Sequence, residues 1–108
     1  MELLSRTEEL LLLTILKLGE EAYGLGIRKQ MSSLLDRKLS VGAVYVPLER
    51  LKKRGLLSSW ESEPTDKRGG RAKRFYKLTN DGVRALRAVK NVHEEAWSGI
   101  PNLNLGFS

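Results

Sequence analysis

The feature that most constrains the fold of this 108-residue chain is a change in the spacing of its apolar residues after Gly55. Before Gly55, apolar residues recur every three or four positions, which is typical of amphipathic helices. Residues 57–61 and 74–78 have the pattern of two short strands separated by turn-forming residues. Helical spacing returns after Thr79. The sequence therefore predicts three helices, a two-stranded β-hairpin and a final helix, in a mainly helical α+β chain.

Small polar residues mark the starts of three of the predicted helices. Ser5 and Glu8 have the spacing of a capping box. Ser40 and Thr79 stand at the N-cap positions of the third and last helices, and Gly19 is a natural stop for the first. The predicted helices lie between Ser5 and Gly19 and over about residues 23–35, 41–54 and 81–99.

Helical spacing also predicts which residues repeat along one face. They are Tyr23, Ile27, Met31 and Leu34 in the second helix, and Val44, Leu48 and Leu51 in the third. Pro47 should kink or loosen the third helix, because proline has no amide hydrogen to donate. Gly24 and Gly26 weaken the start of the second helix. They favour a close approach of another helix or a phosphate there, or else a frayed first turn.

Basic residues are concentrated in the middle of the chain. The protein has 19 Lys and Arg against 13 Asp and Glu, for a net charge of +6, and residues 37–90 hold 15 of those basic side chains. Five cations fall between Lys67 and Arg74, in the predicted hairpin tip. This concentration indicates a surface that binds a polyanion, with a merely solvated cationic face as the alternative.

Composition excludes several other classes of protein. There is no cysteine and one histidine, so disulfides, thiolate metal sites and histidine-rich zinc sites lack their ligands. The longest apolar run, Leu10–Leu13, is too short to cross a bilayer. No catalytic set is visible either. We therefore expect a cytoplasmic protein that is not an enzyme and has no cofactor, metal or membrane partner.

The order of elements predicts a winged helix-turn-helix. Its third helix would lie in the major groove of double-stranded DNA, and the hairpin tip would follow the backbone or minor groove. The predicted organisation is a DNA-binding domain over residues 1–79, a dimerisation helix over 80–100 and a mobile tail over 101–108. Tyr45 is expected on the face opposite Val44 and Leu48, where its phenol can donate to a phosphate, with packing on the hairpin as the alternative.

The chain resembles the PadR-like transcriptional regulators, which are winged-helix repressors that dimerise through the helix after the wing. The resemblance covers residues 7 to about 100 and is carried by AYG at 22–24, GAVY at 42–45, LERLKKRGLL at 48–57 and RGGRAKRFYKLT at 68–79, with Gly82. The family usually has proline directly after the tyrosine. Here Val46 occupies that place and Pro47 follows.

The resemblance implies that Tyr45 contacts DNA and that the Gly-Gly turn with its flanking cations is the wing tip. Together with the small residues that open the third helix, it gives the predicted DNA-binding set: Tyr23, Lys38, Ser40, Gly42, Ala43, Tyr45, Lys67, Arg68, Gly69, Gly70, Arg71 and Lys73. The expected operator is an inverted repeat, because a two-fold dimer reads two symmetric half-sites.

A homodimer is predicted from apolar residues that one small core cannot cover. The run Leu10–Leu13 points to every side of the first helix, and the last helix has a seam at coiled-coil-like spacing. The predicted interface residues are Leu10, Leu13, Leu86, Val89, His93, Trp97 and Ile100. Some family members sense small apolar effectors with a tryptophan late in this helix, so Trp97 is a candidate ligand contact or else a packing anchor.

Two other functions remain open at this point. The first is a winged-helix module that binds another protein through its leucine-rich first helix and the seam of its last helix, without sequence-specific DNA binding. The second is binding of structured RNA, for which the sequence has the charge but lacks the exposed aromatic platform that is usual for binding single strands.

Overall fold

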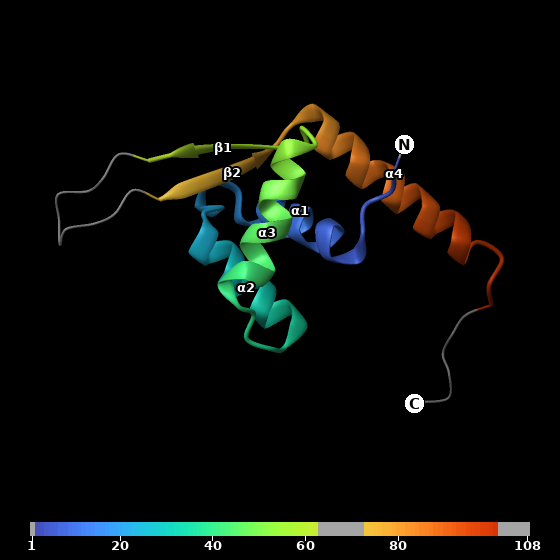
Figure 1. Ribbon diagram of the computed structural model, residues 1–108. Coiled ribbons are helices and arrows are strands. Elements are labelled where there is room, and N and C mark those ends of the chain that lie inside the picture. Colours follow the sequence, from blue (N-terminus) through green and yellow to red (C-terminus); the bar gives the residue numbers. More distant parts are fainter. Residues whose placement is uncertain (1, 63–72, 102–108) are drawn as a thin grey trace.

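The computed structural model describes residues 2–62 and 73–101. The helices are α1 (Arg6–Leu18), a short 3₁₀ turn η1 (Gly19–Glu21), α2 (Gly24–Leu35), α3 (Val41–Lys53) and α4 (Asn80–Trp97); the strands are β1 (Leu57–Glu61) and β2 (Arg74–Leu78) (Figure 1). The predicted order of three helices, a hairpin and a last helix is confirmed. Residues 63–72, which include the predicted wing residues Lys67, Arg68, Gly69, Gly70 and Arg71, lie outside the described residues, as does the tail from 102.

The predicted helix caps are confirmed. The Ser5 hydroxyl accepts from the amide of Glu8, and the Glu8 carboxylate accepts from the amide of Ser5. The hydroxyls of Ser40 and Thr79 each accept from the amide three residues further on. Each such cap satisfies an amide that has no partner inside the helix, which contributes about 1 kcal/mol.

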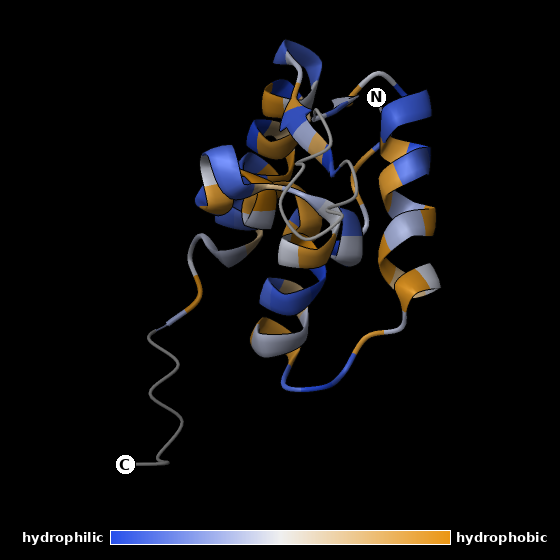
Figure 2. Ribbon diagram, turned by 90° about the vertical axis from the view of Figure 1, so that its left-hand side faces the viewer, coloured by the Kyte–Doolittle hydropathy of each residue, from blue (hydrophilic) through white to orange (hydrophobic). Residues whose placement is uncertain are grey.

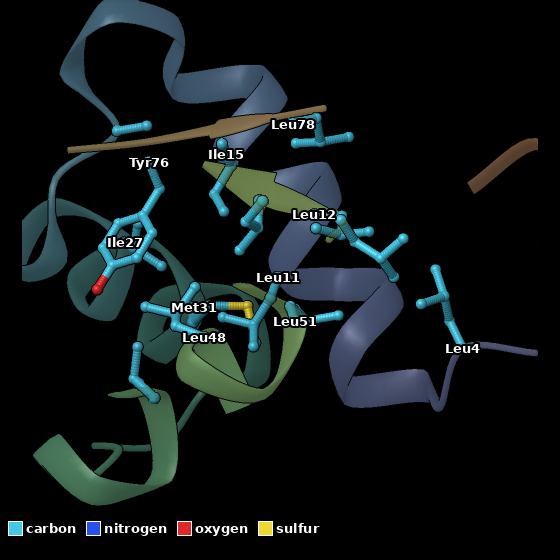
Figure 3. Packing of buried hydrophobic residues seen from close by; sticks show 14 of the residues in the cluster. Leu4, Leu11, Leu12, Ile15, Ile27, Met31, Leu48, Leu51, Tyr76 and Leu78 are labelled. Carbon is cyan, nitrogen blue, oxygen red and sulfur yellow. The ribbon is translucent and has the colours of Figure 1, made fainter. Parts of the chain in front are cut away.

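One core joins all the elements. Buried apolar side chains come from α1, α2, α3, the hairpin and α4, among them Leu11, Leu12, Ile27, Met31, Leu48, Leu51, Tyr76 and Val89. Their packing is seen in Figure 3, where Met31, Leu48 and Tyr76 point into the same interior. Burying each large apolar side chain contributes about 1.5–3 kcal/mol. Figure 2 shows hydrophobic and hydrophilic residues alternating along the helices, so each helix has one face for this core.

The hairpin is antiparallel and is extended by a third short segment. Leu57 pairs with Leu78 and Glu61 with Arg74. The carbonyl of Ala22 accepts from the amide of Tyr76 at 2.9 Å, and Tyr23 forms an isolated bridge with Phe75. The residues just before α2 are therefore fixed to β2 by main-chain hydrogen bonding.

The structure refines the predicted helix faces. Val44, Leu48 and Leu51 are fully buried, as predicted. Leu34 is 52% exposed, whereas Leu35 packs against the core. The buried stripe of α2 therefore ends at Leu35, which is four residues after Met31. α3 continues through Pro47 from Val41 to Lys53, so the proline removes one hydrogen bond without ending the helix.

Candidate nucleic-acid interface

The outward face of α3 is small and apolar at its N-terminal half. With about 3.6 residues per turn, Gly42, Val46 and Lys53 lie on the line opposite the buried side of the helix. All three are exposed, as is Ala43 beside them. The hydroxyl oxygen of Ser40 caps the helix by accepting from the Ala43 amide at 3.1 Å. This half of α3 therefore presents a narrow surface with aliphatic side chains.

Tyr45 lies beside the buried face of α3 rather than opposite it. The side chain is half-buried and packs against the core. Its ring and hydroxyl lie so close to Gly24 that a Cβ there would collide with them. The prediction of an opposite face was wrong, because one residue after Val44 is only about 100° round the helix. The glycine at position 24 is explained by this contact with a phenol.

The start of α2 collects several predicted site residues. Tyr23 is its N-cap, and no side chain caps the helix. The Tyr45 hydroxyl lies against Gly24 in the first turn. The ammonium of Lys73 lies 4.4 Å from the centroid of the Tyr23 ring, which is a cation–π contact. The structure thus places Tyr45 against Gly24 and Lys73 against Tyr23 at the first turn of α2.

Lys73 and Tyr23 belong to a row of aromatic contacts on the hairpin. The Tyr23 and Phe75 rings are 5.8 Å apart, and Trp60 stacks on Phe75 at 5.9 Å with an interplanar angle of 15°. Trp60 therefore packs on the hairpin, although its side chain remains exposed. Trp60, Phe75 and Lys77 also line a groove of about 560 Å³ with Ile15, Leu16 and Leu78.

Some basic residues form ion pairs within the chain, and Arg54 and Arg74 are two of them. Arg54 pairs with Glu8 at 3.0 Å and joins the end of α3 to the start of α1. Burial alone would raise the pKa of Glu8, but hydrogen bonds from Ser5 and the charge of Arg54 outweigh it and lower that pKa below 4.5. Arg74 pairs with Glu61 across the hairpin at 2.8 Å. These two arginines stabilise the fold.

Other basic residues are placed around α3. Lys38 is exposed just before the helix, and Arg50 and Lys53 are exposed on it. No ion pair formed within residues 2–62 and 73–101 involves these three. Arg28 was not predicted, but its guanidinium donates to the Leu39 carbonyl at 2.8 Å and supports the connection from α2 to α3.

The predicted dimer residues fall into two classes. Trp97 and Ile100 are 58% and 47% exposed at the end of α4, and Leu13 is exposed on α1. Leu10, Leu86 and His93 are half-buried, and the His93 ring lies 3.4 Å from the Glu9 carboxylate. The prediction that Val89 lies in the dimer interface was wrong. Its side chain is only 5% exposed and packs in the core of its own chain. Helical spacing does not distinguish a seam that faces α1 from one that faces a second protomer.

Other apolar residues that were not predicted are also exposed; Leu3 and Val92 lie beside His93, whereas Leu16 lines the groove that contains Trp60. Leu3, Leu16 and Val92 are each about half-exposed. Val92 lies three residues after Val89, so the same spacing that predicted the seam also contained it. Within the described residues, no helix is long and apolar enough to span a membrane.

Comparison with known proteins agrees with this geometry. The chain superposes with a TM-score of 0.66 on a PadR-like transcription factor from Bacteroides fragilis, at 30% identity over 84% of this chain and 85% of that one. It is similar to RosR of H. salinarum, at 26% identity with a TM-score of 0.65, over 91% of this chain and 81% of that chain. A transcriptional regulator from Clostridium thermocellum, at 20% identity, shares the fold with a TM-score of 0.66 over 83% of this chain and 82% of that one.

The search of curated proteins gave no match. The profile described as "Transcriptional regulator PadR-like family" matches residues 12–88, which span every element from α1 into α4. The chain therefore belongs to the PadR-like family of transcriptional regulators.

Proposed function

We propose that this protein is a homodimeric repressor that binds double-stranded DNA at an inverted-repeat operator. The observation that carries the proposal is that two surfaces suited to DNA lie next to each other on this protein. The outward face of α3 is exposed and slender at its N-terminal half, and the start of α2 beside it gathers Tyr23, Tyr45 and Lys73. The first suits the major groove and the second suits a phosphate.

The phosphate contact is proposed at the start of α2. The first-turn amides there receive no side-chain cap, and the helix dipole favours an anion at this end. The phenol of Tyr45 and the ammonium of Lys73 add a neutral and a charged donor. Lys38 before α3 extends the same cationic surface. The wing residues Lys67, Arg68 and Arg71, flanking Gly69 and Gly70, are proposed to contact the DNA backbone.

The homodimer is proposed to form through α1 and α4. Leu13 on α1, Trp97 at the end of α4 and Ile100 just after that helix remain exposed, and exposed apolar surface of this kind marks an interface. Leu10, Leu86 and His93 would contribute their accessible edges. A second copy places two α3 helices about one turn of DNA apart, near 34 Å.

The test is selection of bound fragments from genomic DNA, followed by fluorescence anisotropy with the enriched duplex. We expect a palindromic motif bound in the nanomolar range, with a scrambled duplex of equal length bound at least about a thousandfold more weakly. Transcription from a template that carries the motif should fall when the protein is added. Failure to bind any duplex even at low salt would refute the proposal.

Sedimentation distinguishes the alternative of a protein-interaction module. A stable homodimer without any added partner supports the repressor, whereas a monomer that binds no DNA supports the module. A regulator of this class would act in the cytoplasm, where bacterial or archaeal DNA is located. We further propose that a small apolar effector, if the dimer binds one, contacts Trp97, and quenching of Trp97 fluorescence in a Trp60→Phe variant would report it.

A further inference from the structure

The side chains at the N-terminal half of α3 that face outward cannot form hydrogen bonds with bases. They are Gly42, Ala43 and Val46, and all are exposed. Val46 is the largest of them, with 51% of its surface exposed. The first polar side chains on this face, Glu49 and Arg50, come about one turn later. Direct contacts from these side chains can therefore distinguish bases only by shape and apolar contact.

Thymine is the only base of unmodified DNA that presents an apolar group larger than a hydrogen atom in the major groove. Thymine carries a methyl group at C5, whereas guanine, adenine and cytosine present acceptors and amino donors. An aliphatic side chain gains free energy by covering that methyl and leaves no polar atom without a partner. The absence of a side chain at Gly42, one turn before Val46, allows the helix backbone to approach the bases closely.

We propose that Val46 determines operator specificity by packing on the methyl group of a thymine in each half-site. This inference rests on the proposed function, since it requires α3 to enter the major groove. The surrounding charge fits that placement, because the exposed Lys38 precedes the apolar patch in the chain and the exposed Arg50 and Lys53 follow it, where they can contact phosphates. Val46 then selects a base, whereas the cations around it set affinity.

Val41 supplies a matched control on the same helix. Val41 and Val46 have nearly equal exposure, 53% and 51%. They differ in direction, because Val41 lies more than a third of a turn away from Val46 and from the outward line of α3. A general effect of losing an exposed valine should appear in both alanine variants. A methyl contact should be lost only with Val46→Ala.

The experiment uses the selected operator with single thymines replaced by deoxyuridine, which removes one methyl and keeps every hydrogen-bonding group. For the wild-type protein we expect one position in each half-site at which deoxyuridine weakens binding about fourfold. Replacement of a thymine outside the half-sites should change nothing. Val46→Ala should bind thymine and deoxyuridine operators equally, while Val41→Ala should retain the fourfold difference.

A second substitution tests the methyl alone. 5-Methylcytosine keeps a methyl at the same major-groove position but presents an amino donor in place of the thymine carbonyl. We expect it to bind better than unmethylated cytosine at the critical position, with that preference lost in Val46→Ala. If deoxyuridine is tolerated throughout a duplex that the wild-type protein binds tightly, or if Val46→Ala still discriminates, the inference is wrong. Failure to bind any duplex would instead refute the proposed function.

Discussion

At the scale of single residues, the tyrosine that the core buries most completely has an unsatisfied polar atom. Tyr76 is almost fully buried, and its hydroxyl has no hydrogen-bond partner among the described residues. Burial, together with the nearby charge of Glu49, raises the pKa of Tyr76 to about 12. The Tyr76 hydroxyl is therefore harder to ionise in the folded protein than in the unfolded chain.

Tyr76→Phe should raise the free energy of unfolding by about 1 kcal/mol, since a buried hydroxyl without a partner costs roughly that amount. The folded pKa lies above the ordinary value near 10. The stability that depends on a neutral Tyr76 is therefore complete below about pH 10 and is lost as pH rises toward 12. Urea unfolding at pH 7 and pH 11 measures both effects. The variant should lose less stability between the two pH values, and equal losses would contradict this account.

The contact between Gly24 and Tyr45 gives a second prediction. A glycine-to-alanine change in a helix ordinarily stabilises by about 0.5–1 kcal/mol. Gly24→Ala should instead destabilise the protein or displace Tyr45, because the added Cβ collides with the phenol. Gly42→Ala, which has open space around it, is the matched control and should stabilise. Unfolding in urea gives both signs.

A double-mutant cycle identifies the cause. In a Tyr45→Ala background the collision is removed, so Gly24→Ala should cost less than it does in the wild type. Equal costs in the two backgrounds would show that another contact excludes a side chain at position 24.

At the scale of elements, α4 packs one face in the core and leaves the other exposed, so substitutions on its two faces should have different effects. Val89→Asp should destabilise the monomer by more than about 3 kcal/mol, because it places an unpaired charge in the core. Trp97→Asp is on an exposed position and should leave the helical circular dichroism unchanged while producing monomers in sedimentation. A folded Val89→Asp protein of wild-type stability would contradict the placement of Val89 in the core, and a Trp97→Asp dimer of full stability would place the interface elsewhere.

The elements themselves were largely predictable from the sequence. Ser5, Ser40 and Thr79 mark helix starts by local hydrogen bonding, and the period of apolar residues separates helix from strand. Contacts between distant segments were less accessible. A close approach at Gly24 was predictable from helix propensity, but its partner was not, since Tyr45 is 21 positions further along the chain. The pairing of Tyr23 with Phe75 left no comparable local signal.

The candidate site was also predictable only in part: its residue types were indicated by the sequence, but the role of Val46 was not. The cations and small residues near α3 follow from composition, and the family resemblance indicated Tyr45. The outward position of Val46 was available from a helical wheel, since it lies opposite Val44, Leu48 and Leu51. An exposed valine on its own does not indicate function, however, because single exposed apolar residues are common.

At the scale of the whole molecule, the distribution of charge predicts how binding depends on salt. Replacing both Arg68 and Arg71 by alanine should reduce the slope of log affinity against log salt by about one unit for each lost phosphate contact. Arg84→Ala, on α4 and paired with Asp81, is the control and should keep the wild-type slope. Anisotropy titrations over a series of salt concentrations measure the slopes. An unchanged slope in the double variant would remove the wing from the proposed interface.

The short main-chain pairing between Ala22 and β2 has a consequence for how this fold tolerates changes in length. Ala22 is fully buried, while its neighbour Tyr23 faces outward enough to meet Lys73. Neighbouring residues in an extended segment point to opposite sides, so inserting a single residue just before Ala22 would turn an alanine out and a tyrosine in. The number of residues between α1 and that pairing is therefore constrained by the burial of Ala22.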